Sequence, residues 1–266
     1  MSGNQYSHLL STLESLEQRK LFSAHGISHF SANAPQPAIN FLAETGFNAA
    51  GSTWTYDSNT HYGGHSANGT VTTSVQEDDS TSWDWNIATD AAGADNTTQN
   101  LTWEQGSSGV YLASNSLSTN DGYVNEDINF DNLQVCGSTL SKKFSSTSPV
   151  EIDTTDLPEL DGVAKVTTSV LGNKKVTEPA GTFNATEISM VISYKASGST
   201  DADDAGAKSV KVSAKGTDKQ TFYVIDGVGI VKLISSASES ATAAGHGTKV
   251  NLTTTSDLSS YDYETP

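Results

Sequence analysis

The chain has 266 residues, a formal net charge of −17 and 35% hydrophobic residues, and no Lys or Arg occurs between Lys20 and Lys142. Nucleic-acid binding needs clustered cations, so this composition excludes it, and an anionic membrane surface would repel the chain. The acidity serves either solubility or weak Ca²⁺ association outside the cell. The single cysteine, Cys136, rules out an internal disulfide and a cysteine-based zinc site, and we expect it to be buried.

Residues 1–36 are predicted to form an N-terminal export segment and a linker. Leucines at helical spacing occur in residues 7–26, but no apolar run is long enough for an ordinary secretory signal or a membrane span. The stretch LESLEQRKLFSA, residues 13–24, resembles the planctomycete-type N-terminal export motif, with Phe22 in place of the usual second leucine. The resemblance implies a bacterial protein that is secreted or held in the cell envelope. An amphipathic helix docked on the following domain is the alternative. The residues that match the motif are Leu13, Glu14, Leu16, Glu17, Arg19, Leu21 and Phe22.

Residues 37–256 are predicted to form a single β domain, followed by a disordered tail at 257–266. A short helix is expected in residues 37–45, with Ile39 and Leu42 facing a sheet. From Gly51 onward, apolar and polar residues alternate, which is typical of antiparallel strands with one solvated face. Predicted strands lie at residues 52–57, 69–76, 81–89, 99–105, 109–115, 182–196, 209–216, 220–226, 229–236 and 249–256.

The longest strand is expected at Thr182–Ala196, where Ile188, Met190, Ile192 and Tyr194 share one face. No helical crossover for a parallel sheet follows residue 50. About a dozen strands must close or stack to bury their apolar faces, so the predicted fold is all-β, with a strongly curved antiparallel sheet in a half-barrel, barrel or sandwich. Weak periodicity between residues 115 and 161 predicts long loops there.

The tripeptide GST followed by VTTSV occurs twice, beginning at residues 51 and 137. This pattern indicates either an internal duplication with its seam near 115–161 or a chance match in a Ser- and Thr-rich chain.

Three spaced elements carry a second resemblance: Gly51-x-x-Trp54-x-Tyr56, Pro179-Ala180-Gly181-Thr182-Phe183 and Gly227-Val228-Gly229-Ile230-Val231-Lys232. In this order they resemble the lipoprotein-carrier-like superfamily of bacterial envelope β proteins, over most of residues 45–256. The resemblance implies a curved antiparallel sheet with an apolar concave side, no catalytic centre, and a lipid, another apolar ligand or an envelope protein as the partner. The chain lacks the long helices that often cover that concave side.

The remaining motifs supply no catalytic residue, cofactor site or metal site. His61 and His65 flank two glycines and lack a third ligand. An EF-type loop that starts at Asp201 ends in Val212, where an acid is required. The acidic stretches 118–127, 151–162 and 199–206 are expected to be solvated loops. Residues 227–232 are expected to form a strand edge or bulge, since a third glycine and a following helix are missing.

The expected function is therefore non-catalytic: an exported protein that binds an apolar ligand or a protein partner through its curved sheet, without a cofactor. The alternative is a secreted carbohydrate-binding module or a glycoside-active enzyme. Trp83 and Trp85 share one strand face and either pack in the core or form a sugar-stacking platform. Exposed tryptophans would favour the carbohydrate-binding alternative, and buried ones would count against it. A plain surface-layer component is a third class. Paired carboxylates for glycoside hydrolysis stay open, because their separation is a matter of three-dimensional structure.

Overall fold

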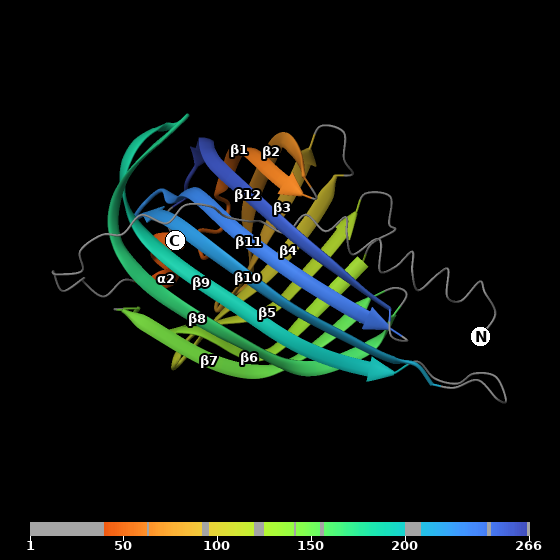
Figure 1. Ribbon diagram of the computed structural model, residues 1–266. Helices are drawn as coiled ribbons and strands as arrows, with labels where there is room; N and C mark the ends of the chain where they lie inside the picture. Colours follow the sequence, from red (N-terminus) through yellow and green to blue (C-terminus); the bar gives the residue numbers. More distant parts are fainter. Residues whose placement is uncertain are drawn as a thin grey trace.

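The structure, a computed structural model, describes residues 40–62, 64–91, 96–119, 125–140, 142–154, 157–199, 209–243 and 246–264. The predicted export segment and linker, residues 1–36, with the export motif at 13–24, lie outside these residues. Within them the chain forms one short helix and twelve strands (Figure 1): α2 (Phe41–Thr45), β1 (Thr53–Tyr62), β2 (His65–Asp79), β3 (Ser82–Ala91), β4 (Thr97–Gly106), β5 (Gly109–Thr119), β6 (Asn125–Gly137), β7 (Lys143–Thr154), β8 (Leu157–Glu178), β9 (Gly181–Ser199), β10 (Lys211–Ile225), β11 (Gly229–Ala243) and β12 (His246–Asp262).

The strands form a closed antiparallel barrel in which each strand pairs with the next one along the chain. β1 and β12 close it, with a register that runs from Thr53 opposite Asp262 to Tyr62 opposite Leu252. Closure gives each described strand a partner on both sides, although the tip of the β8–β9 hairpin pairs only within itself. The predicted all-β antiparallel fold is confirmed, and of the forms that the sequence left open the closed barrel is the one observed.

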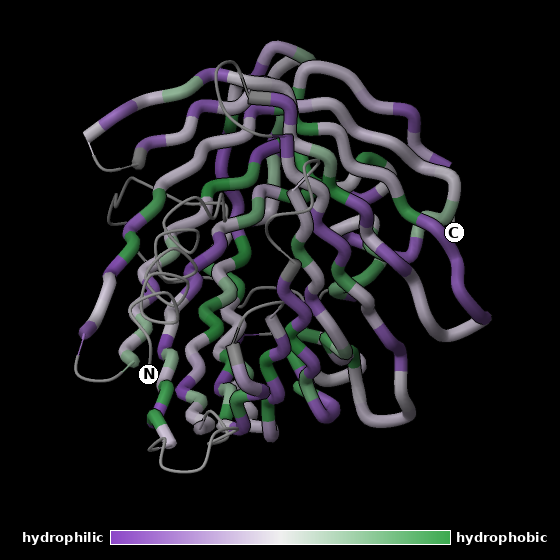
Figure 2. Tube along the Cα trace, turned by 90° about the vertical axis from the view of Figure 1, so that its right-hand side faces the viewer, coloured by the Kyte–Doolittle hydropathy of each residue, from purple (hydrophilic) through white to green (hydrophobic). Residues whose placement is uncertain are grey.

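The inner faces of the strands carry the apolar residues that the alternating pattern predicts. Trp54 and Tyr56 of β1 are 2% and 3% exposed, and Ile188 and Met190 of β9 are 0% and 2% exposed. Figure 2 shows hydrophobic and hydrophilic residues alternating along the strands. Burying apolar surface contributes roughly 25 cal/mol per Å², so hiding these inner faces favours closure of the sheet. No helix among the described residues is long and apolar enough to cross a bilayer.

One end of the barrel is filled by residues 41–47, which we call the plug. α2 starts after Asn40, whose side chain accepts a hydrogen bond from the Ala43 backbone N at 3.5 Å. The helix ends at Gly46, which has a positive φ of 76°. A Cβ atom at this position would lie 2.9 Å from the ring of Trp54, so the turn needs glycine for both its conformation and its space.

The aromatic ring of Phe47 completes the plug. It stacks on Trp103 with ring centroids 4.4 Å apart, and its centroid lies 4.6 Å from that of Trp85 and 6.0 Å from that of Phe222. The predicted helix and the inward-facing Leu42, which is 1% exposed, are confirmed. Ile39 lies outside the described residues.

β8 corrects two predictions. It has 22 residues and is longer than β9, which has 19 and contains the predicted longest strand. The prediction of a solvated loop over residues 151–162 is wrong as well, because β7 and β8 cover 151–154 and 157–162. Here Glu159 and Asp161 face outward while Leu160 faces the core, and hydrogen bonding to the neighbouring strands holds a segment whose sequence alternates weakly.

Two further boundaries differ from the prediction. β5 and β6 include 118–119 and 125–127 of an acidic stretch that was expected to be a loop. β12 continues to Asp262, so residues 257–262 belong to the barrel and not to a tail; Leu258 is fully buried, which gives the physical reason. β5 to β8 run through the expected seam at 115–161 as consecutive strands, and the internal duplication stays a prediction.

Candidate functional site

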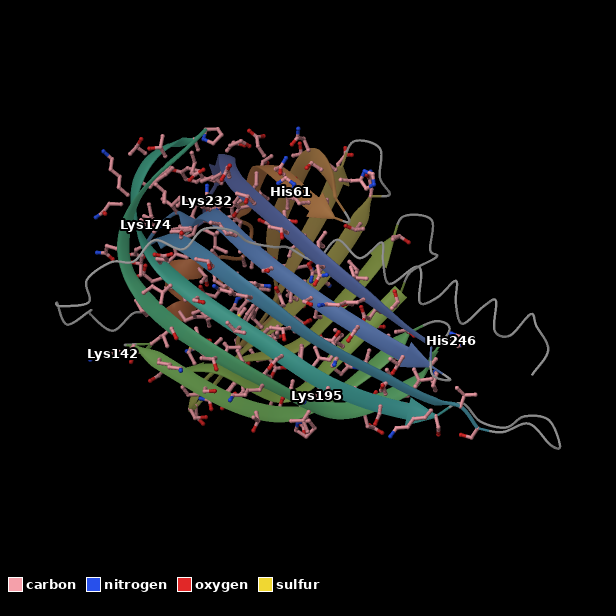
Figure 3. The ribbon with its side chains drawn as sticks, viewed as in Figure 1. His61, Lys142, Lys174, Lys195, Lys232 and His246 are labelled. Carbon is pink, nitrogen blue, oxygen red and sulfur yellow. The ribbon has the colours of Figure 1, made fainter. Side chains whose placement is uncertain are left out.

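A groove on the outer face crosses β8 to β12, with a volume of about 630 Å³. Its cations come from four different strands, and all four lysines are exposed. We call it the lysine groove; its side chains are those of Val163, Lys165, Ser193, Lys195, Lys215, Thr217, Ser238, Ser240 and Lys249. Figure 3 labels Lys195 on the outer face of β9, on the part of the sheet far from Lys174 and Lys232.

Strand register sets the order of the groove residues. Val163 is opposite Lys195, Lys195 is opposite Lys215, Lys215 is opposite Ser240, and Ser240 is opposite Lys249. These five residues therefore form one row across five strands. Three of the five are cations, and none is an acid.

The next row across the same strands is also free of acids. It contains Lys165, Ser193, Thr217, Ser238 and Asn251. Like charges directly opposite each other destabilise a sheet. The Lys195–Lys215 pair therefore lowers the free energy of unfolding, because neither row supplies a carboxylate to offset the repulsion. The groove is thus a cationic surface on a chain with a net charge of −17.

The floor of the groove depends on a glycine. Tyr194 and Gly216 are cross-strand partners, and a Cβ atom at Gly216 would lie 2.5 Å from the ring of Tyr194. The Tyr194 hydroxyl donates a hydrogen bond to Glu239 Oε1 at 2.9 Å on the inner side of the sheet. A second outer hollow, of 340 Å³, shares Lys195, Lys215 and Ser240 with the groove and extends the cationic surface along the strands.

A separate cluster of charges lies where the long β8–β9 hairpin continues past the sheet and curves toward β12 (Figure 1). Its turn at Pro179 and Ala180, where proline and the following Gly181 favour a tight reversal of the chain, brings the Ala180 backbone N to 2.9 Å from the Leu258 backbone O. Near the turn, Lys232 of β11 lies 3.3 Å from Glu178 Oε1 and forms an ion pair with Asp257 of β12.

The base of the hairpin is held by Tyr223 of β10. Its hydroxyl donates to Glu187 Oε1 at 3.0 Å and accepts from Lys174 Nζ at 3.3 Å. We call Lys174, Glu178, Glu187, Tyr223, Lys232 and Asp257 the hairpin clamp. The Glu178 side chain is only 3% exposed. Burial, together with a hydrogen bond to Asp257, raises the pKa of Glu178 to about 7 against the opposing charge of Lys232.

This cluster contains paired carboxylates, which the sequence left open for glycoside hydrolysis. Glu178 and Asp257 share Lys232 as a partner and are hydrogen-bonded to each other, whereas the two carboxyl groups of a glycosidase stand roughly 5 to 9.5 Å apart and flank the bond that is cleaved. Because the Glu178 side chain is almost fully buried, the geometry fits a structural contact that holds the hairpin against β11 and β12.

The barrel interior carries polar groups toward the end opposite the plug. Gln220 donates to Asp218 Oδ2 at 2.6 Å, while Asp218 Oδ1 is buried without a hydrogen-bond partner. Burial raises the pKa of Asp218 to about 7, with Gln220 opposing and Glu239 adding to the increase. An inner cavity lined by Glu126, Tyr194 and Glu239, among others, has a volume of about 20 Å³, which is room for about one water molecule.

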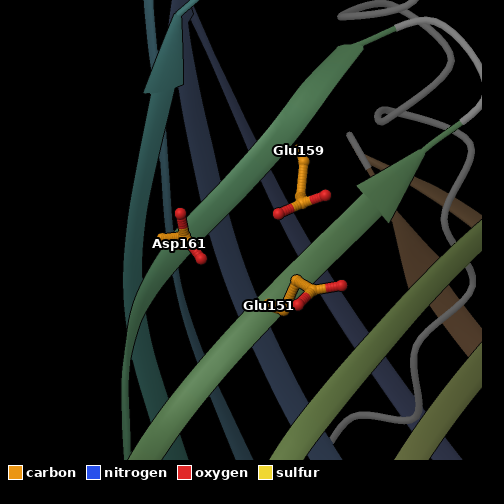
Figure 4. A group of neighbouring side chains, drawn as sticks. All are labelled: Glu151, Glu159 and Asp161. Atoms are coloured by element: carbon orange, nitrogen blue, oxygen red, sulfur yellow. The ribbon is translucent and has the colours of Figure 1, made fainter.

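Three outward carboxylates, Glu151, Glu159 and Asp161, have oxygen atoms within 4.8 Å of one another (Figure 4). Glu151 and Asp161 are directly opposite each other on β7 and β8. All three side chains are exposed, and together they offer three of the roughly six to eight oxygen ligands that Ca²⁺ takes.

The structure places the other singled-out residues apart from the groove. Trp83 and Trp85 are 7% and 3% exposed inside the barrel, so the sugar-stacking platform is excluded for this pair. His61 lies in β1 and is hydrogen-bonded to Ser66, and His65 starts β2. Cys136 is fully buried, as expected, and burial raises its pKa to about 12.

Residues 227–232, where a strand edge or bulge was expected, lie in the turn between β10 and β11 and at the start of β11. Gly227 and Gly229 have positive φ values of 72° and 85° between β10 and β11, and the register shifts next to them, between Tyr223 and Val224. Asp201 and the rest of the 199–206 acidic stretch beyond Ser199 lie outside the described residues.

Sequence reasoning missed the lysine groove. Its four lysines, Lys165, Lys195, Lys215 and Lys249, follow one another at intervals of 30, 20 and 34 residues along the chain, and only strand register brings them together. The sequence indicated only the part of the chain in which a cationic surface could form, because every Lys and Arg except Arg19 and Lys20 lies at or after residue 142. No family model, curated protein or solved structure matches this chain.

Proposed function

We propose that this protein is an exported, non-catalytic bacterial protein of the envelope or the extracellular space, and that it binds an anionic partner in the lysine groove. The export part of the proposal is supported by residues 13–24, which resemble a planctomycete-type export motif. The binding part is supported by the surface of β8 to β12.

The row Lys195, Lys215 and Lys249 is the observation that carries the binding proposal. A sheet gains nothing in stability from placing two lysines opposite each other. Local arrangements that oppose folding are expected at functional sites. Bound anionic groups would relieve this repulsion, so the arrangement makes sense as a surface that is completed by its partner.

The outer face is a better binding surface than the inside of the barrel. The resemblance to lipoprotein carriers implies an apolar ligand on a concave side, but here the plug closes one end with Phe47 among three aromatic rings. The inner cavity near Tyr194 has room for about one water molecule. The groove, at about 630 Å³, is large enough for part of a polymer or a protein surface.

The test is binding of the whole protein to immobilised dextran sulfate, with neutral dextran as the reference surface, by biolayer interferometry. The variant Lys195→Glu/Lys215→Glu is compared with Lys143→Glu/Lys175→Glu, which changes the net charge equally at exposed sites outside the groove. We expect the first variant to lose binding and the second to keep most of it. Equal binding by both variants, or no binding by the unaltered protein, contradicts the proposal.

Export is tested separately, in the bacterium that makes the protein. Changing Leu16 and Leu21 to Asp should retain the protein inside the cell, while the same changes at Leu9 and Leu10, which precede the motif, should not. Native mass spectrometry of the secreted protein then reports what it carries. A co-purifying lipid would argue for an inner ligand and against the groove as the principal site.

A further inference from the structure

The chemistry of the lysine groove also indicates the class of partner, an inference that rests on the proposed function. We infer that the groove binds an extended anionic polysaccharide, that is, a linear sugar polymer with carboxylate or sulfate groups.

The lysines are distributed along a line across the strands. Lys195 and Lys215 lie on adjacent strands, and Lys249 lies two strands beyond Lys215 in the same row. Adjacent strands are about 4.8 Å apart, so the cations stand about 5 and about 10 Å apart at the level of the backbone. A linear polymer lying across the strands can set an acidic group against each lysine, whereas a small anion would occupy only part of the row.

Hydroxyl groups lie beside the lysines. Ser240 separates Lys215 from Lys249, and Ser193 and Thr217 are cross-strand neighbours in the adjoining row. A hydroxyl both donates and accepts hydrogen bonds, which matches the hydroxyls and ring oxygens of a sugar. The polymer would therefore meet both charged and neutral hydrogen-bonding groups along its path.

The groove lacks what a protein partner uses. Protein interfaces are depleted in lysine, and their binding energy is concentrated in Trp, Tyr and Arg. The groove has no arginine, Tyr194 is only 9% exposed, and Val163, at 59%, is its one exposed large apolar side chain. A single-stranded nucleic acid would need exposed aromatic rings for base stacking, which the groove also lacks.

A boundary of the site is set by the carboxylates of Figure 4. Asp161 precedes Val163 on the outer face of β8 and is opposite Glu151. Negative charge at this corner would repel an anionic polymer and direct it toward Lys165 and away from β7. The charge pattern thus favours one path across the sheet.

The experiment is isothermal titration calorimetry of the full-length protein with oligogalacturonates and chondroitin sulfate oligosaccharides of increasing length, from disaccharide to octasaccharide. Neutral malto-oligosaccharides, polyglutamate and vesicles rich in phosphatidylglycerol are the comparison probes. We expect at least one anionic oligosaccharide series to bind, with affinity rising with length until the row is filled. Affinity should fall with added salt, and about tenfold or more in Lys195→Glu/Lys215→Glu, with Lys143→Glu/Lys175→Glu as the matched control.

The outcomes separate this inference from the function on which it rests. If polyglutamate or the vesicles bind through the same lysines at least as tightly as the sugars, the polysaccharide inference is overturned while an anion-binding groove stands. If affinity for the sugars does not change with their length, an extended occupant is ruled out. If no anionic probe binds, or if both double variants bind like the unaltered protein, the inference and the proposed function fail together.

Discussion

The two halves of the barrel, β1 to β6 and β7 to β12, have the same meander topology but differ in the charged residues that they carry. Residues 53–137 contain twelve Asp and Glu and no Lys or Arg, whereas residues 143–262 contain fifteen Asp and Glu together with eleven lysines. Both halves contribute aromatic residues to the same core, through Trp85 and Trp103 on one side and Phe222 on the other. The comparison teaches that the inward residues specify the barrel and leave the outward ones free to differ.

The largest expected loss of stability concerns the aromatic core that both halves share. Phe47→Ala removes the ring that contacts Trp85 and Trp103 of the first half and Phe222 of the second. We expect the free energy of unfolding to fall by about 3–5 kcal/mol, because the change leaves a cavity in a fully buried site. Urea denaturation followed by tryptophan fluorescence measures the loss. Tyr261→Ala, at a residue that is 45% exposed, is the control, and a similar loss there would contradict a central role for the plug.

A second prediction contrasts one glycine from each half. Gly216→Ala in β10 forces a methyl group against the Tyr194 ring, and we expect a loss of about 1–3 kcal/mol from overpacking. Gly137→Ala in β6 adds a methyl group whose nearest neighbour is 3.6 Å away, so its effect should be within about 0.5 kcal/mol. Thermal and urea unfolding of the two variants report the difference. Equal losses would show that the floor of the groove is not tightly packed.

The third prediction concerns pH and the hairpin clamp of the second half. The folded-state pKa of Glu178, about 7, is above its ordinary value of 4.5, so the protonated carboxyl favours the folded hairpin. This stabilisation is fully present below about pH 4.5 and is lost as the pH rises through about 7. We expect hydrogen exchange of residues 171–187, corrected for intrinsic rates, to show weaker protection at pH 8 than at pH 5.

The variant Glu178→Gln should make that protection independent of pH. Asp218 titrates in the same range but faces the barrel interior. Asp218→Asn should therefore change how the hydrogen-exchange protection of β10 depends on pH, and leave the pH dependence of the hairpin unchanged. Hairpin protection that is the same at pH 5 and pH 8 in the unaltered protein would contradict the role given to the clamp.

The smallest expected effects compare like-charge pairs. Asp127 of β6 is opposite Asp153 of β7, where the halves meet, and Lys195 is opposite Lys215 in the groove. Asp127→Asn and Lys195→Gln should each raise the free energy of unfolding by about 0.2–1 kcal/mol, by removing cross-strand repulsion. Only Lys195→Gln should weaken binding of the anionic polymer. If Lys195→Gln neither stabilises the barrel nor weakens binding, the lysine row causes no repulsion in the folded protein and does not bind the polymer, contrary to what we propose.

Much of the fold could be predicted, because a strand with one buried face has a period of two. A spacing of two residues is enough to predict a shared inward face for Trp54 and Tyr56 and for Ile188 and Met190. β8 could not be found in this way. Its outward Glu159 and Asp161 flank a single inward leucine, and the strand depends on pairing with β7 and β9 for its hydrogen bonds.

The candidate site could be predicted far less. No local pattern marks Lys165, Lys195, Lys215 and Lys249 as a group, since each looks like an ordinary solvated residue on an alternating strand. The long hairpin is similar: its turn at Pro179 is evident in the sequence, but its contact with Asp257 depends on how far β8 and β9 extend past their neighbours.

By itself, the sequence determined that the chain is antiparallel β, which residues face inward, where the turn at Pro179 occurs, and that one half has no Lys or Arg. These properties follow from local stereochemistry and from the burial of apolar side chains. Only the tertiary structure decided that β12 closes on β1, that Lys195, Lys215 and Lys249 share one row, and that Lys232 lies between Glu178 and Asp257. Register and closure join residues distant in the chain, and their energies depend on all the strands at once.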